Sequence, residues 1–138
     1  MGKAEAVVGA PVVAQVNVVG LGYNDMEWGR ALGGVLGQAA AEANSRKGAS
    51  PIEPGDKGFL VLTAEELVIT SAGGLITLAP KAVLDRRPRT QVTGAEFGEK
   101  NSSTQVLGIT FADGTSWVLE VPRVVGKKGR ELVTQMGF

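Results

Sequence analysis

The chain has 138 residues, 43% of them hydrophobic, which is enough to bury one ordinary core. Lys and Arg together number 14, as do Asp and Glu, so the overall charge does not indicate nucleic acid as a partner. With no Cys and no His, the chain cannot form disulfides, Cys/His zinc sites or a His-dependent catalytic triad. We therefore expect no cofactor, and a metal site would have to use carboxylates alone, although no Asp-rich calcium loop is present.

The N-terminal region is apolar but lacks the features of a targeting signal. Its run over residues 6–19 is interrupted by Pro11 and Asn17, and Glu5 lies where a signal peptide has a basic flank. No segment reaches the roughly 18 uninterrupted apolar residues that a membrane span requires. We expect a soluble, cytoplasmic protein. Residues 12–19 have the β-branched content of a strand.

Residues 24–46 have the pattern of a helix. Asn24, followed three positions later by Glu27, forms a capping box at its start. Glycine costs a helix about 1 kcal/mol relative to alanine, so this helix requires a close neighbour. Its predicted interaction face combines an aromatic anchor with small residues: Trp28, Gly29, Gly33 and Gly37.

Two interpretations of this small-residue face remain open. The helix packs on its own β-domain or on a twin helix in a dimer, or else it inserts into a membrane. The apolar stretch at 31–41 is too short to span a bilayer at about 1.5 Å per residue. Trp28 is either a core residue or an interface anchor.

A loop rich in Pro and Gly over residues 47–56 separates two parts of one domain. Residues 1–56 form an N-terminal strand and helix, and residues 57–138 form a β-rich region. In that region we predict strands over residues 59–63, 67–70, 75–78 and 90–97, turns at 64–66 and 72–74, and a polar loop at 98–104. Pro80 is expected to end the strand at 75–78, and residues 83–89 are either a short strand or an irregular connection.

The sequence around Asp113 and Gly114 predicts a β-hairpin. A two-residue turn would place Trp117 and Ile109 on opposite faces of the sheet. A three-residue loop over 112–114, with Gly114 left-handed, instead pairs Ile109 with Trp117 and directs all the large apolar side chains to one core. Residues 124–136 then have the spacing of an amphipathic helix, and Gly137 is its expected stop.

These patterns resemble bacterial pleckstrin-homology-like domains over residues 58–138. The string FLVLTAEELVIT at 59–70 is similar to their opening hairpin, FADGTSW at 111–117 to their late hairpin, and residues 124–136 to their capping helix. The resemblance implies an α+β, mainly β fold: a curved antiparallel sheet or barrel of about seven strands with a C-terminal capping helix. Such domains commonly bind lipids, peptides or other proteins. The basic first loop that reads inositol phosphates is missing, because Ala64, Glu65 and Glu66 fill that turn.

Two basic clusters are candidates for contact with an anion or an acidic lipid headgroup. The first is formed by Arg86, Arg87 and Arg89, and the second by Arg123, Lys127, Lys128 and Arg130. The predicted contact residues are Arg86, Arg87, Arg89, Lys127 and Lys128. If the closing helix lies beside the connection around Pro88, the clusters would form one patch. The alternative is that each is a solvated surface, since Asp85 and Glu131 dilute the charge.

The favoured function is a non-enzymatic interaction or assembly module that acts through a protein partner or a homo-oligomer. A peripheral binder of an anionic membrane surface is the alternative. A small ligand-binding barrel or enzyme is a third reading, and without His or Cys it would need carboxylates, Lys or Tyr23 as reactive groups.

Overall fold

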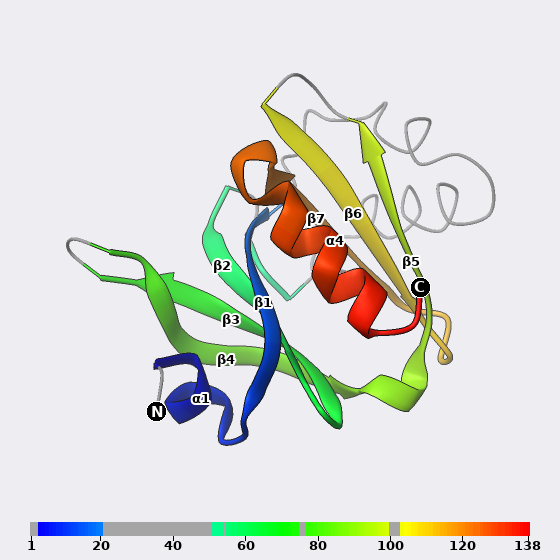
Figure 1. Cartoon of the computed structure of the whole chain (residues 1–138), viewed down its shortest axis with the longest axis horizontal. Helices are drawn as coiled ribbons and strands as arrows, with labels where there is room; N and C mark the ends of the chain where they lie inside the picture. Colours follow the sequence, from blue (N-terminus) through cyan, green and yellow to red (C-terminus); the bar gives the residue numbers. More distant parts are fainter. Residues whose placement is uncertain (1–2, 21–50, 54, 75–76, 100–102) are drawn as a thin grey trace.

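A computed structural model describes residues 3–20, 51–53, 55–74, 77–99 and 103–138 (Figure 1). The chain forms two short α-helices, seven strands and two 3₁₀ turns within these ranges. In order they are α1 (Lys3–Val8), β1 (Val12–Gly20), β2 (Lys57–Thr63), β3 (Glu66–Gly73), β4 (Ala79–Pro88), η1 (Arg89–Gln91), β5 (Val92–Glu99), β6 (Thr104–Phe111), β7 (Ser116–Pro122), η2 (Arg123–Val125) and α4 (Gly126–Gln135).

All seven strands belong to one antiparallel sheet, in the order β4-β3-β2-β1-β7-β6-β5. The predicted N-terminal strand is confirmed as β1, and it is the middle strand of the sheet. The strands β2–β4 run across the direction of β5–β7 in Figure 1, so the sheet is strongly curved. In the part of the chain that the structure describes, β4 and β5 do not pair with each other, so the sheet is not closed into a barrel.

The β6–β7 hairpin has the predicted three-residue loop. Ile109 pairs with Trp117 and Leu107 with Leu119, and Gly114 has a φ of 87°. Both pairs lie in the main core cluster together with Phe111 and Val121. The structure therefore confirms the predicted loop length, the predicted register and the prediction that the large apolar side chains of the hairpin face one core.

Helix α4 covers the inner face of the curved sheet. Leu132 is fully buried in the main core, and Val133 is 8% exposed beside it. Gly129 allows the close approach, because a Cβ at this position would lie 2.9 Å from Cζ of Phe97 on β5. The predicted stop is confirmed: Gly137 has a φ of 99°, its N–H donates to the Thr134 carbonyl, and the Phe138 N–H donates to the Val133 carbonyl.

Helix α1 was not expected from the sequence. It lies against β4 on the outer face of the sheet (Figure 1), where Val8 packs in a second cluster with Phe59, Val61 and Val68. A six-residue helix is not stable alone in water. Its formation therefore depends on this tertiary contact.

Three predictions in the middle of the chain are wrong. The turn predicted at 72–74 does not begin at Ala72, because β3 continues to Gly73 and pairs there with β4. Thr77 and Leu78 are not in a strand, and Pro80 does not end one: it lies in β4, opposite Ala72. Proline is tolerated there because β4 is an edge strand, where an N–H can be missing without breaking a ladder. The segment at 83–89, for which two alternatives were open, lies in β4 except for Arg89. The loop predicted at 98–104 is shorter than expected, because β5 extends to Glu99 and β6 begins at Thr104.

Candidate functional site

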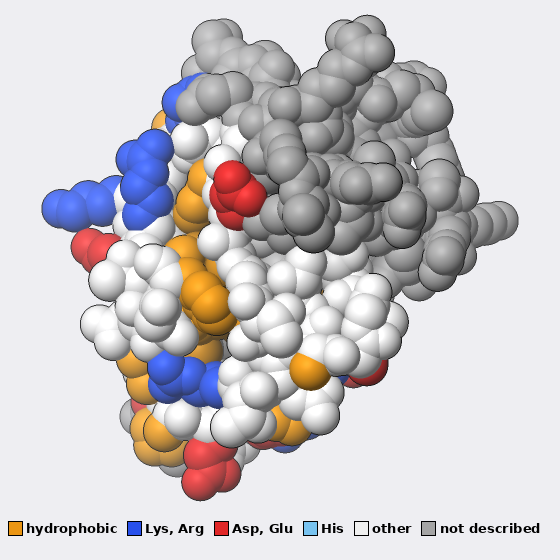
Figure 2. Space-filling view, turned by 90° about the vertical axis from the view of Figure 1, so that its right-hand side faces the viewer, with side chains coloured by type: hydrophobic (Ala, Val, Ile, Leu, Met, Phe, Trp, Pro, Cys, Tyr) orange, Lys and Arg blue, Asp and Glu red, His pale blue; other side chains and the backbone are white. Residues whose placement is uncertain are grey.

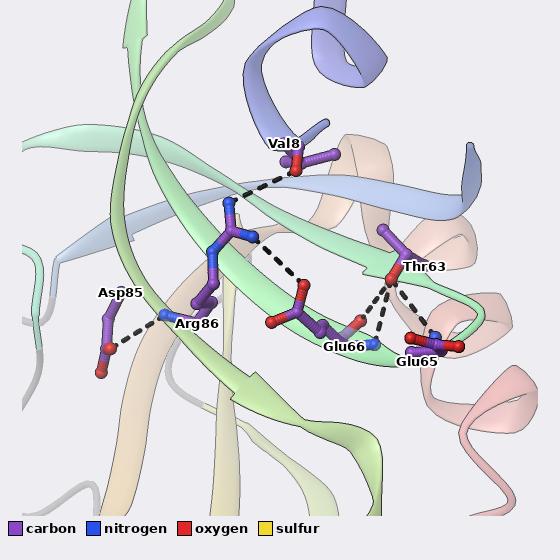
Figure 3. Close-up of polar contacts among 6 residues, drawn as sticks. All are labelled: Val8, Thr63, Glu65, Glu66, Asp85 and Arg86. Carbon is purple, nitrogen blue, oxygen red and sulfur yellow. Dashed lines mark hydrogen bonds and ion pairs between the residues drawn. The ribbon is translucent and has the colours of Figure 1, made fainter. Parts of the chain in front are cut away.

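Arg86 lies on the outer face of β4 and joins three segments (Figure 3). Its guanidinium donates to the Glu66 carboxylate at 3.2 Å and to the Val8 carbonyl at the end of α1 at 3.3 Å. Its backbone N–H donates to Asp85 Oδ1 at 2.8 Å. The side chain is 42% exposed, so the ion pair with Glu66 contributes little to stability by itself. Arg86 is thus engaged in holding α1 against the sheet.

The turn between β2 and β3 is closed by Thr63 (Figure 3). Thr63 Oγ1 accepts from the Glu66 N–H at 3.0 Å and from the Glu65 N–H at 3.4 Å. This side-chain bonding replaces the glycine that a tight hairpin often needs, and no residue other than glycine has a positive φ in the described chain. The predicted turn at residues 64–66 is confirmed, with Glu66 already in β3.

Arg89 connects this turn to the end of α4. Its guanidinium donates to the carbonyls of Thr63 and Ala64, each at 3.4 Å, and to the Gln135 carbonyl at 2.6 Å. Gln135 is the last residue of α4, where unpaired carbonyls and the helix dipole favour a cation. Arg89 therefore acts as a clamp between the helix and the sheet.

Replacing Arg89 with alanine is expected to lower the free energy of unfolding by roughly 1–2 kcal/mol, because charged hydrogen bonds to three carbonyls are lost. Urea denaturation followed by circular dichroism measures the change. Arg130→Ala, at an exposed position on α4 with no polar contact in the described structure, is the matched control and should change stability by less than about 0.5 kcal/mol. If the two substitutions lowered the free energy of unfolding equally, the role of Arg89 in connecting α4 to the sheet would be contradicted.

Arg87 points to the opposite face of β4 from Arg86 and reaches the β6–β7 hairpin. Its guanidinium is 4.7 Å from the ring centre of Phe111, and its Nη1 is 2.9 Å from Asp113 Oδ2. The pKa of Asp113 lies below its ordinary value of 3.8, first because the Thr115 hydroxyl and N–H donate to the carboxylate and then because Arg87 does so. The Asp113 carboxyl is thus ionised at neutral pH, and its contact with Arg87 joins β4 to the other half of the sheet.

Lys127 and Lys128 lie in the first turn of α4, while Arg89 contacts its last residue. At 1.5 Å per residue these two points are about 11 Å apart along the helix axis. The three arginines contact different parts of the molecule. On the face shown in Figure 2, the Lys and Arg side chains that are visible lie in separate groups. The structure therefore does not bring the predicted anion-contact residues into one patch.

The predicted interaction helix lies outside the described residues. This applies to Trp28, Gly29, Gly33 and Gly37 and to the alternatives weighed for them.

The two edge strands differ in a way that sequence reasoning missed. β4 has Pro80 and Pro88 at its ends, carries Lys81 between them, contains irregular pairing with β3, and has α1 packed against it. These are devices that prevent another strand from adding to an edge. β5 has no proline, lysine or arginine, and among the described residues it pairs with β6 alone. The signal was present in the composition of residues 92–99, but only the strand order shows that this segment is an edge.

The described residues contain no group of His, Cys, Asp or Glu side chains placed to hold a metal ion. None of the helices in the described ranges has the length and apolar character to cross a bilayer. No family model, curated protein or solved structure matches the chain.

Proposed function

We propose that the chain is a non-enzymatic assembly module of the pleckstrin-homology-like type, and that it associates with a second copy of itself through the edge of β5. The consecutive antiparallel order of β2–β3–β4 and β5–β6–β7, with β1 between the two halves, supports the fold assignment. So does the C-terminal helix that covers the inner face.

The observation that carries the function is the contrast between the two edges. A strand whose outer N–H and C=O groups have no partner is a template for another strand. On β4 this tendency is opposed by two prolines, by Lys81 and by two irregularities in the pairing with β3. β5 has no proline and one irregularity, between Val92 and Gly94, and it carries Glu96 as an exposed charge. Within the described residues, the features that oppose strand addition are therefore more numerous at β4 than at β5.

A second copy is compatible with the side chains of β5. In antiparallel pairing about a two-fold axis at Ala95, Glu96 of one copy lies opposite Gly94 of the other. The two Glu96 side chains are then not directly opposite each other. The interface is closed and isologous, as in two-fold dimers, which are the commonest oligomers. The exposed side chains of Thr93 and Glu96 leave room for an approaching strand without disturbing the core.

Light scattering after gel filtration, over a range of protein concentrations, is expected to report a dimer. Replacing both Thr93 and Glu96 by lysine places two hydrated cations on the pairing edge, where lysine opposes the addition of a strand, and should raise the dissociation constant of the dimer at least about tenfold. Both side chains are exposed, so the monomer is expected to fold normally.

The matched control places lysines at two exposed positions of the other edge strand, as Ala82→Lys with Leu84→Lys, and should leave the dimer unchanged. A monomer at every concentration would overturn the proposal. A dimer whose dissociation constant is unchanged by the β5 lysines would place the contact elsewhere, and it would also contradict association through β5.

A further inference from the structure

The loop of the β6–β7 hairpin contains Asp113 followed by Gly114, which is the only Asp-Gly or Asn-Gly pair in the sequence. Such a pair can react with itself, because the backbone nitrogen of the second residue can attack the side-chain carboxyl of the first. Glycine has no Cβ, so it leaves this nitrogen unhindered. Both residues are exposed, so water reaches them.

The reaction balances without a cofactor. A bond forms between the Gly114 nitrogen and Asp113 Cγ, the bond from Cγ to the carboxyl hydroxyl breaks, and this hydroxyl leaves as water with the amide proton. A second water then opens the cyclic imide. Opening at the main-chain carbonyl leaves isoaspartate, in which the backbone runs through Cβ and Cγ of residue 113.

The folded hairpin holds both reacting groups in other contacts. The Gly114 N–H donates to the Phe111 carbonyl at 3.0 Å. Asp113 Oδ1 accepts from the Thr115 N–H at 2.9 Å and from the Thr115 hydroxyl at 2.5 Å. Asp113 Oδ2 accepts from Arg87 Nη1 at 2.9 Å. The attacking nitrogen and the attacked carbon must therefore both leave these partners before they can meet.

The same contacts lower the reactivity of the carboxyl. The donors of Thr115, and then Arg87, hold the pKa of Asp113 below its ordinary value. Only the neutral carboxyl has a hydroxyl to lose, and the carboxylate is a poor target for a nucleophile. Because Arg87 comes from β4, this protection depends on the contact between the two halves of the sheet.

We propose that Asp113 and Gly114 form a latent isoaspartate site, which Thr115 and Arg87 keep unreacted while β4 contacts the hairpin. The product adds a methylene group to the three-residue loop that sets the pairing of Ile109 with Trp117. Modification therefore disturbs the register of the hairpin. This inference does not depend on association through β5, so either can fail without the other.

The test is incubation of the full chain at physiological temperature and neutral pH, with tandem mass spectrometry to quantify isoaspartate at position 113 over time. The folded chain should form it at least about tenfold more slowly than the same chain unfolded in urea, because the reaction requires local opening of the loop. Arg87→Met and Thr115→Val each remove one donor to the carboxylate. Each should raise the rate in the folded chain about threefold, the size expected for one contact near the surface.

Arg86→Met is the matched control, because it makes the same change at the neighbouring position of β4. Arg86 contacts Glu66 and Val8 rather than the hairpin, so the rate at position 113 should not change. Circular dichroism checks that all variants are folded. Thr115 is exposed in the loop, so Thr115→Val retains the test if Arg87→Met proves unstable.

Several results would overturn the proposal. They are the absence of isoaspartate at position 113 in the unfolded chain, equal rates in the folded and unfolded chain, and a rate in the folded chain that Thr115→Val or a folded Arg87→Met variant leaves unchanged. An increase in Arg86→Met as large as that in Arg87→Met would also reject it, because the protection would then not depend on contact with the Asp113 carboxylate.

Discussion

Replacing Trp117 with alanine should lower the free energy of unfolding by about 3–5 kcal/mol. Trp117 is 1% exposed, pairs with Ile109 across the hairpin, and packs edge-to-face against Phe111 with ring centres 4.8 Å apart. The same aromatic pair supports the Arg87 guanidinium, which joins the two halves of the sheet. Truncation leaves a large cavity and removes this support. The midpoint and slope of urea denaturation, followed by circular dichroism, measure the loss.

Trp117→Phe is the control, because it retains an aromatic ring in the core and should cost distinctly less than alanine. If the alanine variant lost less than about 1 kcal/mol, this position would behave as a surface site, and the hairpin could not face the core as described.

Gly58→Ala is expected to destabilise the protein by about 3 kcal/mol, which is the upper end of the usual range for overpacking. A Cβ at this position would lie 2.3 Å from the Thr70 carbonyl oxygen and 2.8 Å from Cδ1 of Ile52. The carbonyl belongs to β3, which is paired with β2 at this point, so the backbone cannot move away without disrupting the ladder. The free energy of unfolding from urea denaturation is again the measurement.

Gly73→Ala on β3 is the matched control. Its Cβ would meet only the flexible side chain of Lys81, at 3.0 Å, so alanine should be accommodated. Alanine also restricts the unfolded chain more than glycine does, which favours the folded state. Equal destabilisation at both positions would contradict the close approach of β2 and β3.

The sequence predicted the fold best where side-chain alternation and turn chemistry agree. In the β6–β7 hairpin only one loop length places Trp117 and Ile109 on the same face, so the register follows from the sequence. The closing helix and its stop at Gly137 follow similarly from apolar spacing and from the need for a positive φ.

Tertiary context decided the parts that the sequence did not predict. Pro80 normally ends a strand, and it is accepted in β4 only because that strand has no neighbour on its outer side in the described sheet. The six residues of α1 have too little local stability to be recognised as a helix. The place of Pro80 depends on β4 being an edge strand, and the formation of α1 depends on its packing against the outer face of the sheet.

Tertiary context also decided the arrangement of the predicted anion-contact residues. Arg86, Arg87 and Arg89 are nearly consecutive in the sequence, which indicates a basic patch. In the structure they contact α1, the β6–β7 hairpin and the end of α4, respectively. Val124, in contrast, has the apolar character of a core residue, and only the structure shows that it faces solvent.

Hydrogen–deuterium exchange at low and high protein concentration tests the central claim, association through β5, most directly. Amides of Val92–Glu99 should become more protected as concentration rises, while those of Ala79–Pro88 on the opposite edge should not change. The variant with lysines at positions 93 and 96 should lose this dependence. Protection of β5 that is identical at all concentrations, or a concentration effect confined to β4, would contradict the account.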